Sequence, residues 1–438
     1  MINYELGIAI IDILFAAVII IMAAISWYYV AGFFLAMKRT KAAPHSDKKT
    51  RFAVLIPARN ESKVVKNIIN SLKNQTYPEE YFDVWFITES YEDETNVIAA
   101  ENGYNYFIRD ELTDQRKTKG FALQECIRYF KANDLQYDAY MIFDADNVMD
   151  SDYLEKMNDL RQTGVEVGVG YRNFTNANTN WLTATSAILF TYMNSFTSKN
   201  RTILFKKALI AGTGYYVNSD IIDEAGGWIF TGMTEDTELT TYCEYHDINM
   251  KYYPLINFYD EQSPSFRANH AQHIRWIWGF AENRKRFMKG GVNHHATSKA
   301  RNRAAIFEYR TSIIPFATAC VLDFLLIVAS AFLYGFSFKY DPSFTNTLLV
   351  HLLTQIGLLY FLFAFVAIAT IGHNYNRLKL KWWIIVLAVL TYFFFFADLL
   401  FAFIHGLIRP KQRKTWKPIK HSGKIKDKRA KKVSKDGK

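Results

Sequence analysis

The chain has 438 residues, of which half are apolar, and its 52 Lys and Arg against 42 Asp and Glu give a net charge of +10. This length allows two or three domains, and the long apolar runs exclude an ordinary soluble protein. Residues 409–438 hold 14 Lys or Arg against two Asp, a surplus of 12 that leaves the rest of the chain close to neutral. The charge therefore indicates a tail near anionic membrane lipids, or a solvated disordered tail, and no nucleic-acid partner.

An apolar run from Ile8 to Leu35 opens the chain and contains Asp12 as its one charged residue. It is longer than the roughly 20 residues that cross a hydrocarbon core as a helix, and no small-residue cleavage site follows it. We therefore predict an uncleaved transmembrane anchor over residues 1–37 and a basic linker over 38–50. Because the Lys and Arg residues follow this run, the rest of the chain from residue 40 is expected in the cytosol.

Residues 51–265 are predicted to form a cytosolic α/β domain. Short apolar strands are expected at 52–56, 81–88 and 139–143, and helices at 61–73, 95–102 and 119–131. Strands and helices that alternate at this length predict a mostly parallel sheet, with ligands at the carboxyl ends of its strands. Three widely separated cysteines fit neither a zinc site nor a disulfide framework, as expected in a reducing compartment.

The strongest local motif, Asp144-Ala145-Asp146, follows the third predicted strand directly. Two carboxylates at the mouth of a sheet suit Mg²⁺ or Mn²⁺, which complete their coordination with substrate phosphate oxygens. We predict that Asp144 and Asp146 bind such a metal, which would neutralise a diphosphate leaving group. A surface turn can carry the same pattern. Phosphatases of the haloacid dehalogenase type also begin with such a strand, but here about 90 residues of α/β sequence precede it.

A second acidic motif is Thr234-Glu235-Asp236, which follows Gly232-Met233. Adjacent carboxylates predict a general base, because one charge raises the pKa of the other group. We assign Asp236 as this base. Thr234 could also cap a helix predicted over 238–245, and capping would not exclude catalysis.

A third motif, Gln272-His273-Ile274-Arg275-Trp276, lies in a segment that is both aromatic and basic. Residues 266–300 are therefore predicted to form helices at the membrane interface. Arg275 suits a diphosphate and an exposed Trp276 suits the apolar face of a sugar ring. Taken alone, the motif would fit ordinary interfacial anchors better.

Apolar runs near 312–336, 348–371 and 382–408 predict about three transmembrane helices within residues 311–408. Three crossings would place the basic tail, 409–438, outside the cell, against the positive-inside rule. A re-entrant segment would resolve this conflict, and we predict a cytosolic, disordered tail.

Together, the three motifs in this order and spacing resemble the membrane-integrated family 2 glycosyltransferases. Cellulose, chitin, hyaluronan and poly-N-acetylglucosamine synthases belong to that group. The resemblance spans roughly Arg51–Gly290. It implies a GT-A fold, a UDP-sugar donor and an inverting displacement in a bacterial plasma membrane, with the catalytic domain in the cytosol.

Further positions carry the same resemblance. It implies that the donor is bound by residues of the first strand, the later helices and the motifs: Pro57, Arg59, Glu61, Glu89, Lys119, Asp144, Gln272 and Arg275. It implies that the acceptor is bound by Gly212, Thr213, Gly214, Glu235 and Trp276. The chain departs from the family at Glu89, where the family has an Asp that reads the uracil. Trp416-Lys417-Pro418 resembles a cytosolic segment of some members, which favours a cytosolic tail.

The resemblance implies that UDP-N-acetylglucosamine or UDP-glucose extends a β-linked polysaccharide that the enzyme exports, with room for an accessory membrane or export protein. One alternative is a transferase that adds a single sugar to a membrane lipid. Another is a membrane scaffold or transporter, because Asp323 and Asp398 lie within apolar segments, where ionisable residues often serve a function.

Overall fold

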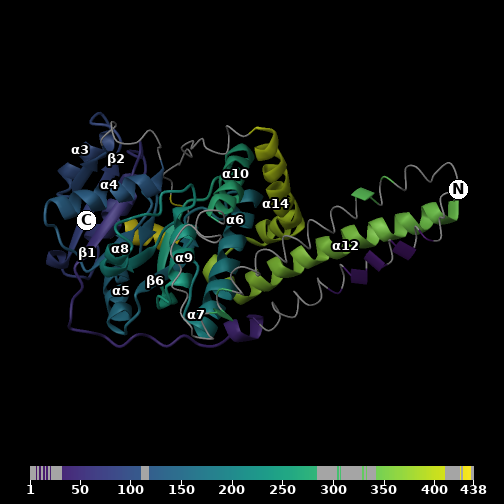
Figure 1. The fold of residues 1–438 in the computed structure, drawn as a ribbon, viewed down its shortest axis with the longest axis horizontal. Coiled ribbons are helices and arrows are strands. Elements are labelled where there is room, and N and C mark those ends of the chain that lie inside the picture. The colour runs from purple at the N-terminus through teal and green to yellow at the C-terminus, as the bar shows by residue number, and fades with distance from the viewer. Residues whose placement is uncertain are drawn as a thin grey trace.

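The computed structural model describes residues 32–109, 118–283, 342–409 and 428–435, with isolated positions before 32, between 303 and 332, and at 425. Most of the predicted N-terminal anchor lies outside the described residues, as do Asp323, Trp416–Pro418 and most of the predicted span at 312–336. Figure 1 shows an α/β body at one end of the molecule, from which helix α12 extends away.

A mixed sheet forms the centre of the body, with the strand order β3-β2-β1-β4-β7-β6-β8-β5 among the described residues. The strands are β1 (Phe52–Pro57), β2 (Phe82–Thr88), β3 (Asn105–Ile108), β4 (Ala139–Ile142), β5 (Val148–Met149), β6 (Val167–Phe174), β7 (Tyr215–Asn218) and β8 (Met250–Asp260). The prediction of a mostly parallel sheet holds for β1 to β4, which pair in parallel. Beyond β4 the sheet is mixed, because β7 is antiparallel to both β4 and β6, and β5 is antiparallel to β8, whereas β6 and β8 pair in parallel.

The first predicted elements are confirmed with small shifts of their ends. Helices α2 (Val65–Lys73), α3 (Glu94–Glu101) and α4 (Lys119–Ala132) follow the expected periodicity. Helix α2 begins four residues later than predicted. The preceding loop is fixed instead by Asn60, which has a φ of 57° and donates its backbone N–H to Asp93 Oδ2 at 2.8 Å.

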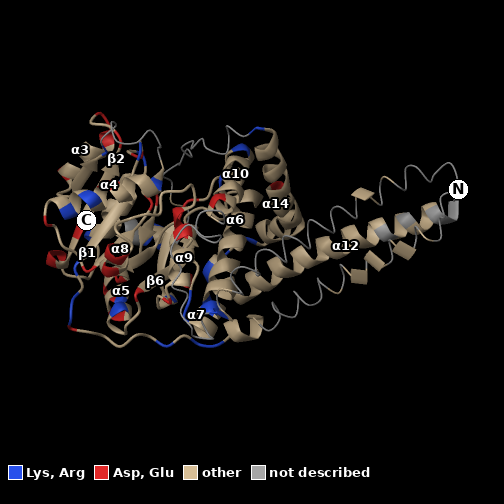
Figure 2. Ribbon diagram, viewed as in Figure 1, with Lys and Arg blue, Asp and Glu red and all other residues tan. Residues whose placement is uncertain are grey.

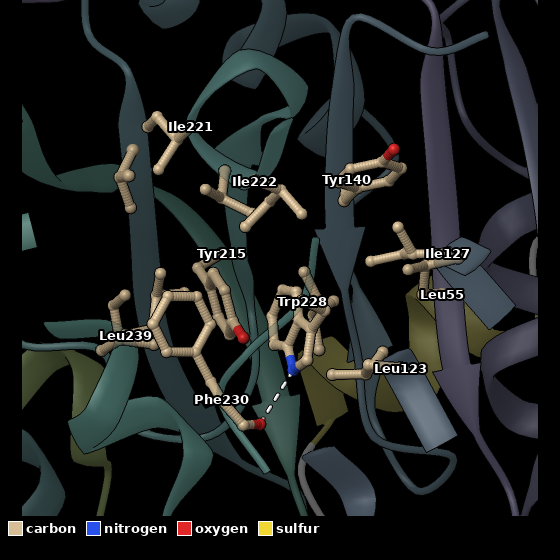
Figure 3. Close-up of a cluster of buried hydrophobic side chains, with 14 of the residues drawn as sticks. Leu55, Leu123, Ile127, Tyr140, Tyr215, Ile221, Ile222, Trp228, Phe230 and Leu239 are labelled. Atoms are coloured by element: carbon tan, nitrogen blue, oxygen red, sulfur yellow. Dashed lines mark hydrogen bonds between the residues drawn. The ribbon is translucent and has the colours of Figure 1, made fainter. Parts of the chain in front are cut away.

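Apolar side chains of the sheet are buried on both faces. In β1, Ala53 and Leu55 join one cluster while Phe52, Val54 and Ile56 join the other, as the two-residue period of a strand requires. The first cluster lies under α4, α8 (Ser219–Glu224) and α9 (Glu235–Tyr245) and surrounds Trp228. Figure 3 shows this indole donating to the carbonyl oxygen of Phe230, at 2.9 Å. A buried central sheet of this kind gives the strand ends fixed positions.

Long helices pack beside the α/β body. The chain runs through α6 (Trp181–Tyr192), the π-helix η2 (Met193–Ser198) and α7 (Lys199–Phe205), and α6 packs on α12 (Pro342–His373) and α14 (Trp382–Ile408). Thr345–His373 and Trp382–Ile408 are the described helices that are long and apolar enough to cross a membrane. Large side chains such as Phe361 and Phe394 point outward, 70% and 59% exposed. Such an apolar surface is typical of contact with lipid or with another protein.

The helix α10 (Phe266–Asn283) carries the third motif, and it packs on both α14 and α9. The predicted interfacial segment beyond 283 lies outside the described residues.

The described end of the basic tail is ordered. Residues Lys428–Lys435 form helix α15, where the sequence analysis predicts disorder. The prediction is wrong for this segment because fully buried Ala430 packs against Val148 and Tyr259. In addition, Arg429 Nη2 donates to the carbonyl oxygen of Arg377, at 2.6 Å.

Candidate active site

The predicted site residues gather at the carboxyl ends of the parallel strands. Pro57 ends β1, Glu89 follows β2, and Asp144 comes two residues after β4. Figure 2 shows acidic segments near α9, in the region between the sheet and helices α6 and α10. The fold therefore brings together residues that are far apart in the sequence, as expected at this edge of an α/β sheet.

Lys119 links two of these segments. Its Nζ lies 2.5 Å from Asp144 Oδ1, donates to the carbonyl oxygen of Gly212 at 2.7 Å, and lies 4.0 Å from Glu235 Oε1. Burial alone would lower the pKa of Lys119, but the charges of Asp144, Glu235 and Asp236 outweigh burial and leave the pKa raised. The first residue of α4 thus supplies a permanent positive charge among three carboxylates.

The residue after Lys119 has to be glycine. A Cβ on Gly120 would lie 2.2 Å from the carbonyl oxygen of Phe230. The close approach of these two backbones brings the start of α4 against the loop before the acidic motif.

The motif Thr234–Asp236 lies at the N-terminus of α9, which begins at Glu235 and so three residues earlier than predicted. Thr234 is the N-cap residue, but its side chain makes no capping hydrogen bond to the backbone and accepts instead from the hydroxyl of Thr237. Asp236 Oδ1 accepts from the backbone N–H of Thr237, at 2.8 Å. The helix N-terminus favours a negative charge at this position.

Both carboxyls of the pair have raised pKa values. Burial, followed by the charge of Asp236, raises the pKa of Glu235 to about 8. Burial also raises the pKa of Asp236, against the opposing effects of the Thr237 N–H, Lys119 and Arg172. A carboxylate with a raised pKa is a stronger base when ionised, which suits proton abstraction from a hydroxyl.

The metal residues predicted from Asp144-Ala145-Asp146 lie near two further carboxylates. Asp146 is 8% exposed. The side-chain amide of Asn147 donates to a carboxylate oxygen of Asp146 and to one of Asp260, each at 3.2 Å. Burial, followed by the charges of Asp260, Asp144 and Glu61, raises the pKa of Asp146 well above its usual value. Crowded carboxylates of this kind fit a hard divalent cation. Among the described residues, no group of three or more His, Cys, Asp or Glu side chains has a metal-binding arrangement by itself.

The segment Gly212–Gly214 holds the Asp144-Ala145-Asp146 segment in place. The hydroxyl of Thr213 accepts from the backbone N–H of Asp144 at 2.9 Å and donates to Asn147 Oδ1 at 2.5 Å. Thr213 is 2% exposed and its hydroxyl already makes these two hydrogen bonds. A contact between Thr213 and an acceptor sugar stays a prediction. Gly214 has a φ of +68°, and a Cβ there would lie 2.1 Å from the ring of Phe258.

The predicted base-reading residue, Glu89, is fixed by two arginines. Its carboxylate oxygens lie 2.9 Å from Arg59 Nε and 3.4 Å from Arg109 Nη1. Arg109 in turn makes a two-pronged ion pair with Glu125, at 2.8 and 3.1 Å. Arg59 and Glu89 therefore lie side by side at the ends of β1 and β2, which is the expected arrangement of a donor loop.

Of the third motif, Arg275 faces the carboxylates. Burial lowers the pKa of Arg275, and the nearby charges of Glu235 and Asp144 partly offset this effect. Two residues behave differently: Gln272 is half-buried, and Trp276 packs edge-to-face on Phe190 of α6, with ring centroids 5.8 Å apart. Sequence reasoning gave Trp276 to the acceptor, and its observed contacts are with the helices beside the site.

Sequence analysis missed Arg172 of β6. Its Nη1 lies 3.5 Å from Asp260 Oδ2, its Nη2 donates to the carbonyl oxygen of Ala211, and its guanidinium lies 4.3 Å above the ring of Phe190. The charge of Arg172 also lowers the pKa of Asp236. A single arginine inside the apolar run Val167–Phe174 was the available signal, because an arginine is rarely buried unless it has partners.

Residues 50–279 match the family described as "Glycosyltransferase like family 2", which is just over half of the chain. The chain belongs to this family. A curated relative, the probable glycosyltransferase YdaM of Bacillus subtilis, is 27% identical over 238 residues, which are 52% of this chain and 55% of YdaM. The beta-monoglucosyldiacylglycerol synthase of Trichormus variabilis is 27% identical over 236 residues, or 52% and 48% of the two chains. This chain thus spans about half the length of the curated relatives it matches.

Solved structures show the fold of this family 2 glycosyltransferase independently. The mannosyltransferase PcManGT from Pyrobaculum calidifontis, in complex with GDP-Man and Mn²⁺, matches with a TM-score of 0.51 and 16% identity. The match covers 78% of this chain and 97% of PcManGT. The prediction of a GT-A-like α/β domain is thereby confirmed.

Proposed function

We propose that this family 2 glycosyltransferase transfers a hexose from UDP-N-acetylglucosamine or UDP-glucose to an acceptor hydroxyl with inversion, and that Asp236 is its base. The observation that carries the proposal is the position of Asp236. It lies at a helix N-terminus, has a raised pKa, and is close to the Gly212 loop, where an added Cβ would be 3.9 Å from its Oδ2. This position supports a role as base, because the Gly212 segment is the one proposed to receive the acceptor.

The donor diphosphate would be held by Lys119 and Arg275, because both cations lie near Asp144 and Glu235. Asp144 and Asp146 would hold Mg²⁺ or Mn²⁺, which would supply positive charge to the diphosphate leaving group. The nucleoside would lie at the ends of β1 and β2, against Pro57, Arg59, Glu61 and Glu89. Guanidinium and ammonium groups are suited to phosphate oxygens through charge-assisted hydrogen bonds.

The reaction we propose is a single displacement. Asp236 takes the proton of the acceptor hydroxyl, the acceptor oxygen forms a bond to the anomeric carbon, and the bond from that carbon to the diphosphate oxygen breaks. The bonding pair leaves with UDP, and the base sits on the face opposite to the leaving group. A single base without a second carboxylate nucleophile favours inversion, which gives a β-linked product from an α-linked donor.

The first candidate acceptor is a growing polysaccharide that is exported across the membrane. The support is the resemblance carried by Gln272–Trp276, on a helix that packs directly on the apolar helix α14. In this proposal the enzyme is a multi-pass protein of the bacterial plasma membrane. Anionic lipids contact its basic tail, and an accessory membrane or export protein takes part.

The second candidate acceptor is a membrane lipid that receives one sugar. Two observations favour it: a curated relative is named a beta-monoglucosyldiacylglycerol synthase, and the site helix α10 lies between the carboxylates and α14. A lipid headgroup at the membrane surface would reach such a site without a channel.

The experiment is a measurement of UDP release by the purified full chain, over a panel of UDP-sugars with Mn²⁺ or Mg²⁺. Release from one donor that is lost on chelation and in Asp236→Asn would support the proposal, and retained turnover in Asp236→Asn would remove Asp236 from the base role. Product length then separates the acceptors. Long chains support the polysaccharide, whereas one or two sugars on a lipid support the second candidate.

A further inference from the structure

A buried polar network joins α10 to the apolar helix α14. Asp398 of α14 accepts two hydrogen bonds from α10, one from Nδ1 of His270 and one from Nδ1 of His273, both at 2.7 Å. Asp398 is 3% exposed and His273 is fully buried. One carboxylate therefore holds two histidines that lie one helical turn apart.

A second layer of contacts fixes the ring orientations. His270 Nε2 lies 2.9 Å from Nδ1 of His405, and His273 Nε2 lies 3.3 Å from the amide of Asn269. Because an ionised Asp398 can only accept, the Nδ1 atoms of His270 and His273 donate to it. These contacts hold both imidazole rings in one orientation, each with its Nδ1 directed at Asp398.

The location of Asp398 makes the network costly to maintain. It lies within Trp382–Ile408, one of the helices long and apolar enough to span a membrane. A carboxylate in such a segment is expensive unless it is fully paired, and residues of this kind are retained for a function. Apolar contacts also join the two helices, such as Trp278 of α10 stacked on Phe403 of α14 with ring centroids 5.3 Å apart, so α10 could rest on α14 without a charge.

The opposite side of α10 meets the catalytic residues. At 100° per residue, Arg275 and Gly279 point away from His270 and His273. Gly279 packs so closely on α9 that an added Cβ would lie 2.5 Å from Cγ2 of Thr234. Helix α10 is thus held between α14, through Asp398, and the start of α9.

We propose that Asp398 is a positioning residue for glycosyl transfer, which fixes the rotation and depth of α10 through His270 and His273 and thereby aims Arg275 at the donor diphosphate. The inference rests on the donor role of Arg275 that is part of the proposed function. Loss of the Asp398 carboxylate would let α10 turn or shift. A displacement of about 1 Å at a binding group can cost roughly a hundredfold in rate.

The test is a double-mutant cycle on the full-length protein in detergent, read as UDP release against donor concentration. The variants are Asp398→Leu, Arg275→Ala and the double mutant. Thr391→Val is the matched control on α14, because the Thr391 hydroxyl bonds to the Leu387 carbonyl of its own helix. We expect Asp398→Leu to raise the KM for the donor and to lower kcat/KM by roughly ten- to a hundredfold. Thr391→Val should stay within about twofold of wild type, the range of a substitution without a shared partner.

The cycle separates positioning from general stability. If Asp398 acts through Arg275, Asp398→Leu should lower kcat/KM less than about threefold once Arg275 is already alanine. Losses that multiply in the double mutant would overturn the inference and leave the proposed function intact. An unchanged KM in Arg275→Ala would overturn both. If the Asp398→Leu protein does not accumulate, Asp398→Asn replaces it, because asparagine keeps the volume and one acceptor oxygen. Its smaller loss of kcat/KM must then disappear when Arg275 is already alanine.

Discussion

The guanidinium of Arg172 lies 3.5 Å from the carboxylate of Asp260 and also donates to the backbone carbonyl of Ala211, next to Gly212. It thereby connects the carboxylates around Asp146 to the segment that faces Asp236. One buried cation influences both acidic groups, so its removal should be felt at each of them.

The first prediction concerns Arg172→Met. The charge of Arg172 lowers the pKa of Asp236, so its loss should raise that pKa further. A base must be deprotonated to act, and the acid limb of the pH profile of kcat/KM should therefore move to higher pH, by about one unit. Arg172→Lys keeps the charge and should move the limb less. A profile that keeps its wild-type acid limb in Arg172→Met would show that the two groups are not coupled.

The second prediction concerns Lys119→Gln. The ammonium contacts Asp144 and Gly212, so its loss should weaken donor binding and raise the donor KM roughly ten- to a hundredfold, as expected for a charged hydrogen bond. Lys131→Gln on the same helix is the matched control, since Lys131 pairs with the exposed Asp223 and should leave KM unchanged. Initial rates against donor concentration decide the matter. Equal KM values for the two variants would contradict a donor role for Lys119.

The third prediction concerns metal binding and pH. Burial and neighbouring carboxylates raise the pKa of Asp146, so the folded chain holds a proton there that the unfolded chain has lost. Without metal, the contribution of Asp146 to the free energy of unfolding falls as the pH rises above the pKa that Asp146 has in the unfolded chain. Because Mn²⁺ binds the deprotonated carboxylates, the gain in Tm on adding Mn²⁺ should be larger near pH 8 than near pH 5.5. A gain that does not depend on pH, or that persists in Asp146→Asn, would place the ion elsewhere.

The fourth prediction compares two glycines. Gly214 and Gly103 both have positive φ, at +68° and +78°, but a Cβ meets the Phe258 ring at 2.1 Å in the first case and nothing within 4 Å in the second. Gly103→Ala should cost about 1 kcal/mol for its backbone conformation alone. Gly214→Ala should cost about 2–4 kcal/mol, because overpacking adds to that strain. Thermal unfolding of both variants would measure the difference, and similar losses would mean that the ring moves aside freely.

The parts of the site that could be predicted from sequence are those in which a local pattern carries the chemistry. Asp144, Asp236 and Arg275 each stand in a short motif, and the strands before them follow from apolar runs bounded by polar residues. The pairing of Arg172 with Asp260 could not be predicted, because they meet through the parallel pairing of β6 with β8, which are far apart in the chain. The role of Thr213 was equally hidden, since its partners Asp144 and Asn147 come from another loop.

Contacts between distant segments were also beyond prediction among the helices α10, α14 and α15. Apolar length predicts the helices α12 and α14, but the network at Asp398 needs two helices whose contact no periodicity encodes. The helix at 428–435 packs on the body through one small side chain, Ala430, which contacts Val148 and Tyr259, and through Arg429. A run of Lys and Arg hides such a residue from any analysis based on composition.

The docking of α15 has a practical consequence for experiments that shorten the chain. Val148 and Tyr259, on which Ala430 rests, are near neighbours in the chain of Asp146 and Asp260. Deleting the basic tail to test lipid binding would therefore also uncover the strand pair beside the metal residues, and lost activity could be misread as lost membrane attachment. Charge-neutral replacements at the exposed Lys431 and Lys432, with Ala430 kept, separate the two effects. An affinity tag is better fused away from this end of the chain.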